Sequence, residues 1–260
     1  MGALNHLLVE DRVIQGEGTN VKSWLETFSQ NPLFSLNIES WNAKRIVIVA
    51  PHPDDEILGC GGLIQQLAHQ NCEIVILAVT NGTLSHPESK KYSSEDLNQL
   101  RPQESLMALQ SLGVAQQTQH ITLNLTDGQV HMQTDQLWQS LNQIIQDEDI
   151  LICTYSGDGH PDHEAVGRTV EKFSKIKKLT CLQVLIWAWH WASPLDSRID
   201  WQRGRAYLLT DEQLSKKRRA ILQFKTQIES DETTGQEAIL SSVVIERLLM
   251  PYEVYLSESF

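Results

Sequence analysis

The sequence predicts an α/β fold of the Rossmann-like type, a three-layer sandwich built on a mostly parallel sheet. Strand-like runs of β-branched residues alternate with helical patterns from residue 45 to residue 191. The first run, RIVIVA at 45–50, is apolar throughout, as expected for a strand covered on both faces. Alternating βα units of this kind favour parallel strands joined by right-handed crossovers.

The elements follow from periodicity and turn signals along the chain. The predicted strands are 45–50, 72–80, 120–125, 149–155 and 180–191. The predicted helices are 57–70, 93–113, 134–147 and 163–176, with further helices near 21–30, at 212–228 and at 236–250. We expect one domain over residues 1–260, with an N-terminal extension over 1–40 and a helical addition over 206–260.

Composition excludes several classes of function. With 21 Lys and Arg against 33 Asp and Glu, the formal net charge is −12, which disfavours a nucleic-acid groove and a polybasic membrane patch. The longest apolar run, at 181–192, is too short to span a bilayer, and the first residues lack a basic leader. The 4 cysteines form no CxxC pair, so we expect a cytoplasmic protein without disulfides.

Two acid-and-histidine motifs follow the first and fourth predicted strands. HPDDE occupies 52–56, and HPDH occupies 160–163. Each motif alone fits an ordinary helix start, because proline suits the first turn and carboxylates favour the positive end of the helix dipole. If the two strands are neighbours, however, both motifs open into one crevice beyond the carboxyl ends of the strands.

Together the motifs point to a catalytic divalent metal. Two imidazoles and one carboxylate with an open fourth position form the pattern of hydrolytic zinc sites. Zinc lowers the pKa of a bound water and polarises a substrate carbonyl, and an adjacent carboxylate can take the proton of that water. Iron or cobalt would suit the same ligands.

The strand–PHPDDE–glycine pattern with a later HPDH resembles the PIG-L/LmbE-like deacetylases over roughly residues 44–170. That family includes zinc-dependent enzymes that remove acetyl from N-acetylglucosaminyl groups in mycothiol, bacillithiol and GPI-anchor precursor synthesis, and glycopeptide-antibiotic deacylases. The resemblance implies an LmbE-like domain that removes an N-acyl group, acetyl above all, from an amino-sugar small molecule or glycoconjugate.

Residue by residue, the resemblance implies His52, Asp55 and His163 as zinc ligands and Asp54 as the general base. It implies His160 as the group that stabilises the oxyanion or protonates the departing amine; Asp54 could also return the proton that it took.

Other positions carry weaker expectations. Some family members have a tyrosine where this chain has Asp158, which leaves oxyanion stabilisation open. We expect Glu56 to support the helix start or a ligand, and Asp162 to cap the helix that carries His163.

Three residues are candidate substrate contacts. Arg101 and Glu104 resemble the family's R-x-x-E, in which the arginine can reach substrate; an i,i+3 surface pair is the alternative. Asp127 resembles an aspartate at a strand end in the family, or belongs to an ordinary turn. His190 lies near the end of the last predicted strand.

Trp187, Trp189 and Trp191 alternate, so on a strand they would share one face. That face could be a platform for a sugar ring, a core layer or the interface of a homo-oligomer.

Three other functions compete with a sugar deacetylase. A nucleotide-binding oxidoreductase or methyltransferase fits the strand order, but the carboxylates at 54–56 would repel a pyrophosphate. A non-catalytic metal- or sugar-binding protein would not need the complete set of ligands and base. An amidase acting on a non-sugar N-acyl compound shares the same site chemistry.

Overall fold

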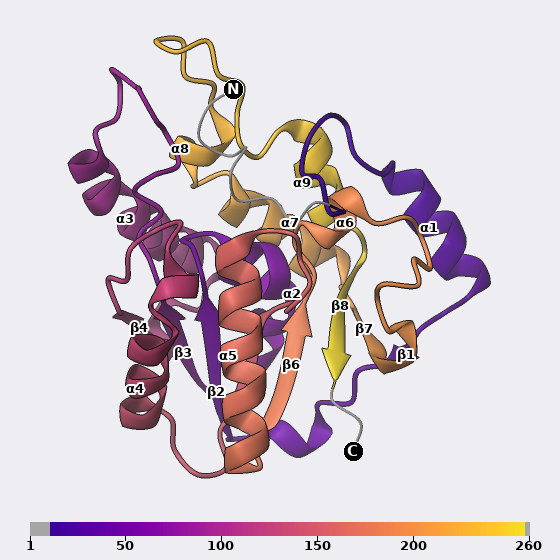
Figure 1. Ribbon diagram of the computed structural model, residues 1–260. Helices are drawn as coiled ribbons and strands as arrows, with labels where there is room; N and C mark the ends of the chain where they lie inside the picture. The colour runs from indigo at the N-terminus through magenta and orange to yellow at the C-terminus, as the bar shows by residue number, and fades with distance from the viewer. Residues whose placement is uncertain (1–10, 258–260) are drawn as a thin grey trace.

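A mixed sheet runs through the molecule, and the computed structural model describes residues 11–257 (Figure 1). The strands are β1 (Phe34–Ser35), β2 (Arg45–Ala50), β3 (Glu73–Ala78), β4 (Thr118–Thr122), β5 (Ile150–Thr154), β6 (Thr180–Val184), β7 (Gly204–Leu208) and β8 (Tyr252–Ser257). They form an 8-stranded sheet in the order β1-β7-β8-β6-β5-β2-β3-β4. The half from β6 to β4 is parallel, whereas β8 runs antiparallel to both of its neighbours.

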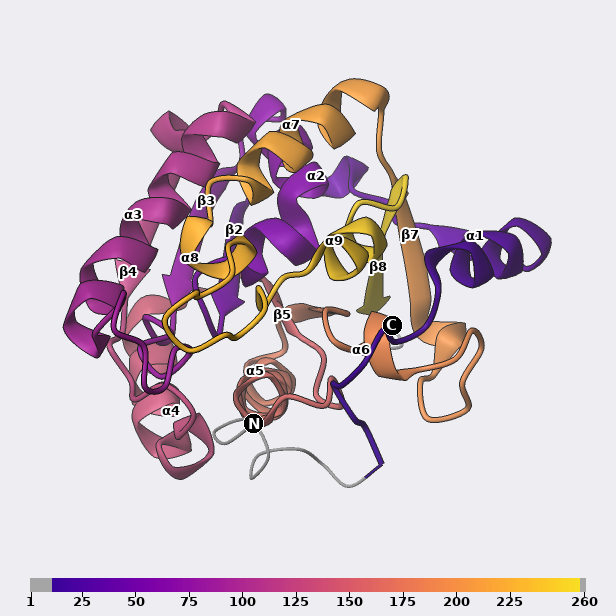
Figure 2. The same ribbon diagram turned by 90° about the horizontal axis from the view of Figure 1, so that it is seen from above.

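Helices cover both faces of the sheet (Figures 1 and 2). They are α1 (Val21–Gln30), α2 (Asp55–His69), α3 (Ser94–Leu112), α4 (Thr134–Ile144), α5 (Pro161–Lys177), α6 (Ala188–Trp191), α7 (Asp211–Ile221), α8 (Lys225–Ile228) and α9 (Ser242–Leu248). Seen from above, α4 and α5 lie on one side of the sheet and α2, α3 and α7 on the other. The expected three-layer α/β sandwich is therefore confirmed.

The apolar run in β2 serves both layers of the core. Ile46 and Ile48 belong to the core cluster under α2, α3 and α7. Val47 and Val49 belong to the cluster under α4 and α5. Because successive side chains of a strand point to opposite faces, a strand buried on both sides must be apolar at every position.

The carboxyl ends of β2 and β5 lie side by side, as the motif argument requires. Val49 pairs with Cys153 in the parallel register of these two strands. The loops that leave both strands start at the same edge of the sheet, so the HPDDE and HPDH segments meet there.

The tryptophan segment was predicted wrongly. The strand ends at Val184, and Ala188–Trp191 forms the short helix α6. The three indoles therefore do not share a strand face. Trp189 is 4% exposed and packs edge-on against Trp24, at 4.9 Å between ring centroids, whereas Trp191 lies under the guanidinium of Arg198. The segment leaves the sheet because backbone amides at 186–188 bind a buried carboxylate instead of a strand.

The C-terminal addition was predicted to be helical, and this prediction was wrong in part. Strands β7 and β8 lie there and complete the sheet. The expected helix 212–228 is divided into α7 and α8, and the expected helix 236–250 is limited to α9.

Two further expectations concern the membrane and the cysteines. Within residues 11–257 the chain has no helix long and apolar enough to cross a bilayer. Cys60, Cys72, Cys153 and Cys181 are all buried free thiols.

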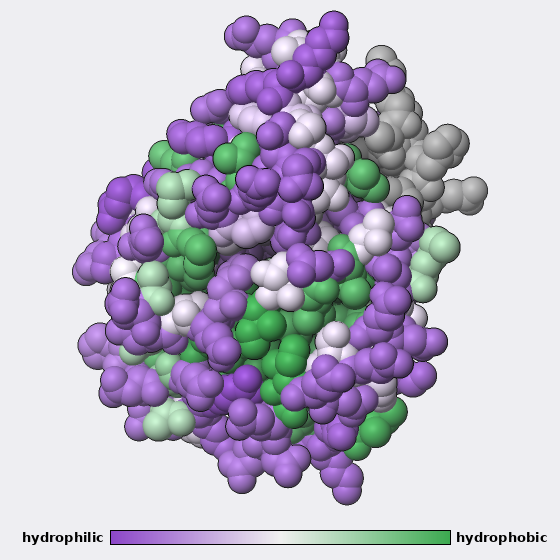
Figure 3. All heavy atoms as spheres, turned by 90° about the vertical axis from the view of Figure 1, so that its left-hand side faces the viewer, coloured by the Kyte–Doolittle hydropathy of each residue, from purple (hydrophilic) through white to green (hydrophobic). Residues whose placement is uncertain are grey.

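The outer surface is mostly polar, but apolar side chains gather near the edge strand β4 (Figure 3). Exposed large apolar residues on the neighbouring elements include Leu106 and Met107 on α3 and Met132 after β4.

Candidate metal centre and active site

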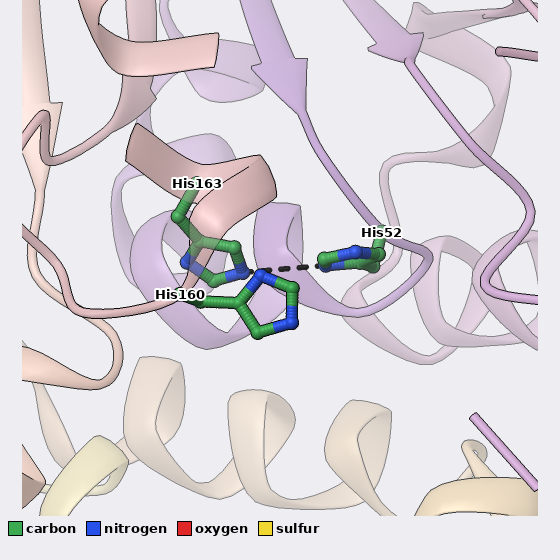
Figure 4. Close-up of side chains that lie close together, drawn as sticks. All are labelled: His52, His160 and His163. Atoms are coloured by element: carbon green, nitrogen blue, oxygen red, sulfur yellow. Dashed lines mark hydrogen bonds between the residues drawn. The ribbon is translucent and has the colours of Figure 1, made fainter. Parts of the chain in front are cut away.

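Three imidazoles meet beyond the carboxyl ends of β2 and β5 (Figure 4). His52 comes from the loop after β2, and His160 and His163 come from the start of α5. Their ring centroids lie 4.8 to 5.2 Å apart. The side chains converge although more than a hundred residues separate the two motifs.

The three predicted metal ligands present a compact donor set. His52 Nδ1 lies 3.3 Å from His163 Nε2 and 3.4 Å from Asp55 Oδ2, and His163 Nε2 lies 3.3 Å from the same Asp55 oxygen. Ligands bound tetrahedrally to zinc at about 2.0–2.1 Å stand about 3.3–3.4 Å from one another. The spacing of these atoms therefore fits a small divalent cation.

His160 supplies a third ring close to this set. A nitrogen of each of the three histidines lies within 4.8 Å of the others. His160 is the N-cap of α5, and its Nδ1 accepts the backbone N–H of Asp162 at 3.3 Å. An accepting Nδ1 means that the proton of the neutral ring is on Nε2. Burial, together with the neighbouring His52 and His163, lowers the pKa of His160 to about 3.

Carboxylates hold the other nitrogen of His52. Its Nε2 lies 3.2 Å from Asp127 Oδ1 and 3.3 Å from Asp162 Oδ2. Asp127 is fixed by the backbone N–H of Leu84. Burial alone would lower the pKa of His52, but its contacts with Asp127, Asp162 and Asp55 raise it well above the usual range. Asp127, expected as a substrate contact, instead orients His52, one of the predicted ligands.

The expectation that Asp162 caps α5 was wrong. Its carboxylate accepts the backbone N–H groups of Gly128, at 2.7 Å, and Val130, at 3.1 Å. Asp162 therefore ties α5 to the loop after β4, while His160 takes the capping position.

Asp54 is a buried carboxyl at a strained turn. It is 5% exposed, and its φ of 129° lies in a region that residues other than glycine seldom adopt. Strain of this kind costs about 1–3 kcal/mol and collects at functional sites. Burial raises the pKa of Asp54 well above its usual range, although Arg101 opposes that shift.

Arg101 fixes the turn that carries Asp54, so the alternative of a surface pair with Glu104 was wrong. The residue is 2% exposed, and its guanidinium donates to the carbonyl oxygens of Pro53, at 2.8 Å, and Gly82, at 3.1 Å. Its Nη2 also lies 3.3 Å from Asp54 Oδ2. Glu104 instead accepts two hydrogen bonds from Thr226.

His190 lies in a different environment. The residue is 5% exposed, and its Nε2 lies 3.1 Å from the carbonyl oxygen of Gln15 while its Nδ1 lies 2.8 Å from Arg247 Nη2. Both ring nitrogens are thus engaged between the N-terminal segment and α9, which leaves neither for a ligand.

Asp158 is a site residue whose role the sequence did not reveal. Its Oδ2 lies 2.8 Å from Nδ1 of His163, and the side chain is fully buried. Burial lowers the pKa of His163, but Asp55 and Asp158 outweigh burial and raise it to about 9. The sequence signal for this contact was a carboxylate five positions before His163, a predicted ligand.

Comparison with known proteins identifies the part of the chain that holds this site. Residues 47–174 match the PIG-L family, described as GlcNAc-PI de-N-acetylase. The chain carries a PIG-L family domain. This domain contains the three histidines and the surrounding carboxylates, and the resemblance inferred from HPDDE and HPDH is confirmed.

Curated relatives share this PIG-L region. The uncharacterized deacetylase YaiS of Escherichia coli is 34% identical over 130 residues, which cover 47% of this chain and 64% of YaiS. A probable N-acetyl-alpha-D-glucosaminyl L-malate deacetylase 2 of Bacillus subtilis is 28% identical over 133 residues, covering 49% of this chain and 59% of that protein. The chain therefore spans less than two thirds of these relatives.

Solved structures share the fold of this chain. The N,N'-diacetylchitobiose deacetylase of Pyrococcus horikoshii aligns with a TM-score of 0.54 and 20% identity, covering 73% of both chains. GalB, a 4-carboxy-2-hydroxymuconate hydratase of a Pseudomonas strain, aligns with a TM-score of 0.51 and 14% identity over 71% of this chain and 80% of its own. The fold thus occurs with more than one reaction, and the function has to be argued from the site.

Proposed function

We propose that this chain is a metal-dependent N-deacetylase that hydrolyses the N-acetyl group of an amino-sugar small molecule or glycoconjugate. The observation that carries the proposal is the set of three donor atoms, 3.3 to 3.4 Å apart, together with the buried carboxyl of Asp54, the residue before Asp55. His52, Asp55 and His163 would hold the cation, with zinc favoured by the mixture of nitrogen and oxygen donors. When bound, such an ion supplies Lewis acidity that polarises an amide carbonyl and acidifies water.

Asp54 acts as the general base in this proposal. Adjacent side chains diverge, so Asp55 can face the cation while Asp54 faces the attacking water. Arg101 and the strained turn hold the Asp54 carboxyl in position. After the water has attacked the acyl carbon, Asp54 returns the proton to the nitrogen of the departing amine, so that one proton is taken and one is given back.

His160 acts as the donor to the oxyanion. Because its Nδ1 accepts from the backbone, its Nε2–H is free to donate to the negative oxygen that develops on the acyl carbon. A neutral imidazole can perform this task without changing its protonation state.

The names of the relatives support the proposed substrate class. They include deacetylases of N-acetylglucosaminyl malate, of an inositol glycoside of 2-acetamido-2-deoxyglucose and of diacetylchitobiose. An N-acetylated glucosamine unit is common to these names, whereas the group attached to it differs. We therefore propose the N-acetylglucosaminyl unit as the part of the substrate that this site recognises.

A substrate panel tests the proposal. The purified chain is incubated with zinc and with N-acetylglucosamine, its disaccharide, its glycosides with malate and inositol, and a set of N-acetyl amino acids, and released acetate is measured. We expect acetate from at least one sugar conjugate and none in the presence of chelator. Acetate from the amino acids alone would favour the non-sugar amidase, and chelator-resistant release would contradict metal dependence.

A further inference from the structure

Asp158 lies at the junction between the metal centre and the tryptophan segment. It follows β5, and its side chain is fully buried, with 0% exposure. Its carboxylate accepts three consecutive backbone N–H groups at the start of α6, from Ile186 at 3.1 Å, Trp187 at 2.9 Å and Ala188 at 2.9 Å. The indole N–H of Trp191 donates to its carbonyl oxygen at 2.7 Å.

The fourth partner of the carboxylate is His163, whose Nδ1 lies 2.8 Å from Asp158 Oδ2. Backbone N–H groups donate to both oxygens of the Asp158 carboxylate, so the carboxylate acts as the acceptor throughout and Nδ1 of His163 donates the proton of this contact. The other nitrogen, Nε2, is the one that faces Asp55 and His52.

We infer that Asp158 is a positioning residue that holds His163 in the tautomer with Nδ1 protonated and Nε2 directed at the cation. The three backbone amides prevent the carboxylate from moving with the ring, so the start of α6 sets the direction of His163. This inference rests on the metal site of the proposed function. It also explains why β6 ends early, since the amides of 186–188 are committed to Asp158.

An amide side chain at position 158 would favour the other tautomer of His163, with the proton on Nε2. The substitution Asp158→Asn keeps nearly the shape of the side chain, but the new NH2 group would have to face either His163 Nδ1 or a backbone N–H. In the first case Nδ1 becomes the acceptor and the proton moves to Nε2, where it competes with the cation. Loss of an orienting partner of this kind lowers metal affinity by roughly 10–100-fold.

The first experiment measures the zinc dissociation constant of the full chain by competition with a chromophoric chelator. We expect Asp158→Asn to weaken zinc binding by roughly 10–100-fold. Asp149→Asn is the matched control, because Asp149 is 3% exposed and accepts from Gln146 and Arg45 at the opposite end of β5. The control should bind zinc as wild type does. Wild-type affinity in Asp158→Asn, or an equal loss in both variants, would overturn the inference.

A second measurement needs no variant and covers the case in which Asp158→Asn does not fold. In the zinc-loaded wild-type chain with ¹⁵N-labelled histidine, long-range proton–nitrogen spectra locate the ring proton of His163. We expect it on Nδ1, and a proton on Nε2 would refute the assignment.

The two proposals can fail separately. Tight zinc binding with the expected ring proton but no release of acetate from any substrate would reject only the deacetylase. A wild-type chain that binds no zinc would overturn both.

Discussion

Two buried clusters of charged residues contact α2, one near its middle and one at its N-terminal end, and they differ in how their charges are satisfied. Near the middle of α2, Glu253 of β8 accepts from Lys217 Nζ at 2.7 Å, from the amides of Gly62 and Leu63 at 2.6 and 2.9 Å, and from the Tyr255 hydroxyl at 2.9 Å. At the N-terminal end of α2, the candidate metal centre places ring nitrogens and a carboxylate oxygen 3.3 to 3.4 Å apart.

This difference distinguishes a cluster that stabilises the fold from one that is a candidate for binding and catalysis. The Lys217–Glu253 cluster pairs one cation with one anion and uses the remaining lone pairs on backbone and hydroxyl donors. At the candidate metal centre, Asp54, Asp55, Asp127, Asp158 and Asp162 are all buried, and Arg101 pairs with Asp54. Five buried carboxylates beside converging ring nitrogens are consistent with the cation site proposed above.

The largest expected effect is a loss of catalysis caused by a substitution at the candidate metal centre. Asp54→Asn removes the proton acceptor and keeps the ligands, so kcat/KM should fall by roughly 10²–10⁴-fold on the substrate identified by the acetate panel. Metal content, measured by elemental analysis, should stay at that of wild type. Normal turnover by this variant would show that another group is the base.

The next effect is on folding, from a change at the other cluster. Lys217→Met leaves Glu253 buried without its cation and should lower the free energy of unfolding by about 3–5 kcal/mol. Urea unfolding of the metal-free chain measures this loss. If Lys217→Met is as stable as wild type, then the cluster does not hold α2 against β8 as described.

Much of this arrangement could be predicted from sequence, because it is encoded in contiguous patterns. The apolar runs RIVIVA at 45–50 and ILICT at 150–154 correctly predicted β2 and β5. The ends of these two strands showed where the HPDDE and HPDH motifs would lie. The neighbouring positions of β2 and β5 then brought His52, Asp55 and His163 together as expected.

What could not be predicted depends on contacts between distant segments. β8 has no long apolar run, and only its pairing with β6 and β7 makes it a strand. WAWHW at 187–191 alternates like a strand, yet the amides of residues 186–188 bind Asp158, and that partner lies on another loop. The contact of Asp127 with His52 likewise depends on the path of the loop after β4.

A smaller effect is expected on stability when zinc binds to the folded chain. If free zinc is held at 100 times its dissociation constant, the free energy of unfolding should rise by about 2.7 kcal/mol, since the unfolded chain has no assembled site. His163→Ala should abolish this gain, whereas Lys217→Met should keep it on a lower baseline. Thermal unfolding with zinc and with chelator provides the comparison. An equal gain in His163→Ala would remove His163 from the ligand set.

The smallest effect is expected next to the buried lysine. Lys216 forms an exposed i,i+4 pair with Glu212, whose side chain is 77% exposed. Lys216→Met should change the free energy of unfolding by less than about 0.5 kcal/mol, because exposed pairs are screened by water. Urea unfolding compares Lys216→Met with Lys217→Met. Equal losses in the free energy of unfolding would mean that burial is not what distinguishes the two lysines.

The position of β8 between β6 and β7 has a consequence for synthesis on the ribosome. β8 pairs with two strands that precede it in the chain, so neither pairing can form until residues 252–257 have emerged. At about 5–20 residues per second, this happens on the order of ten seconds after His163 is made. During that interval the parallel half can assemble around its histidines, while β6 presents an open edge. Nascent chains stalled in this window should therefore recruit chaperones, and completion of β8 should release them.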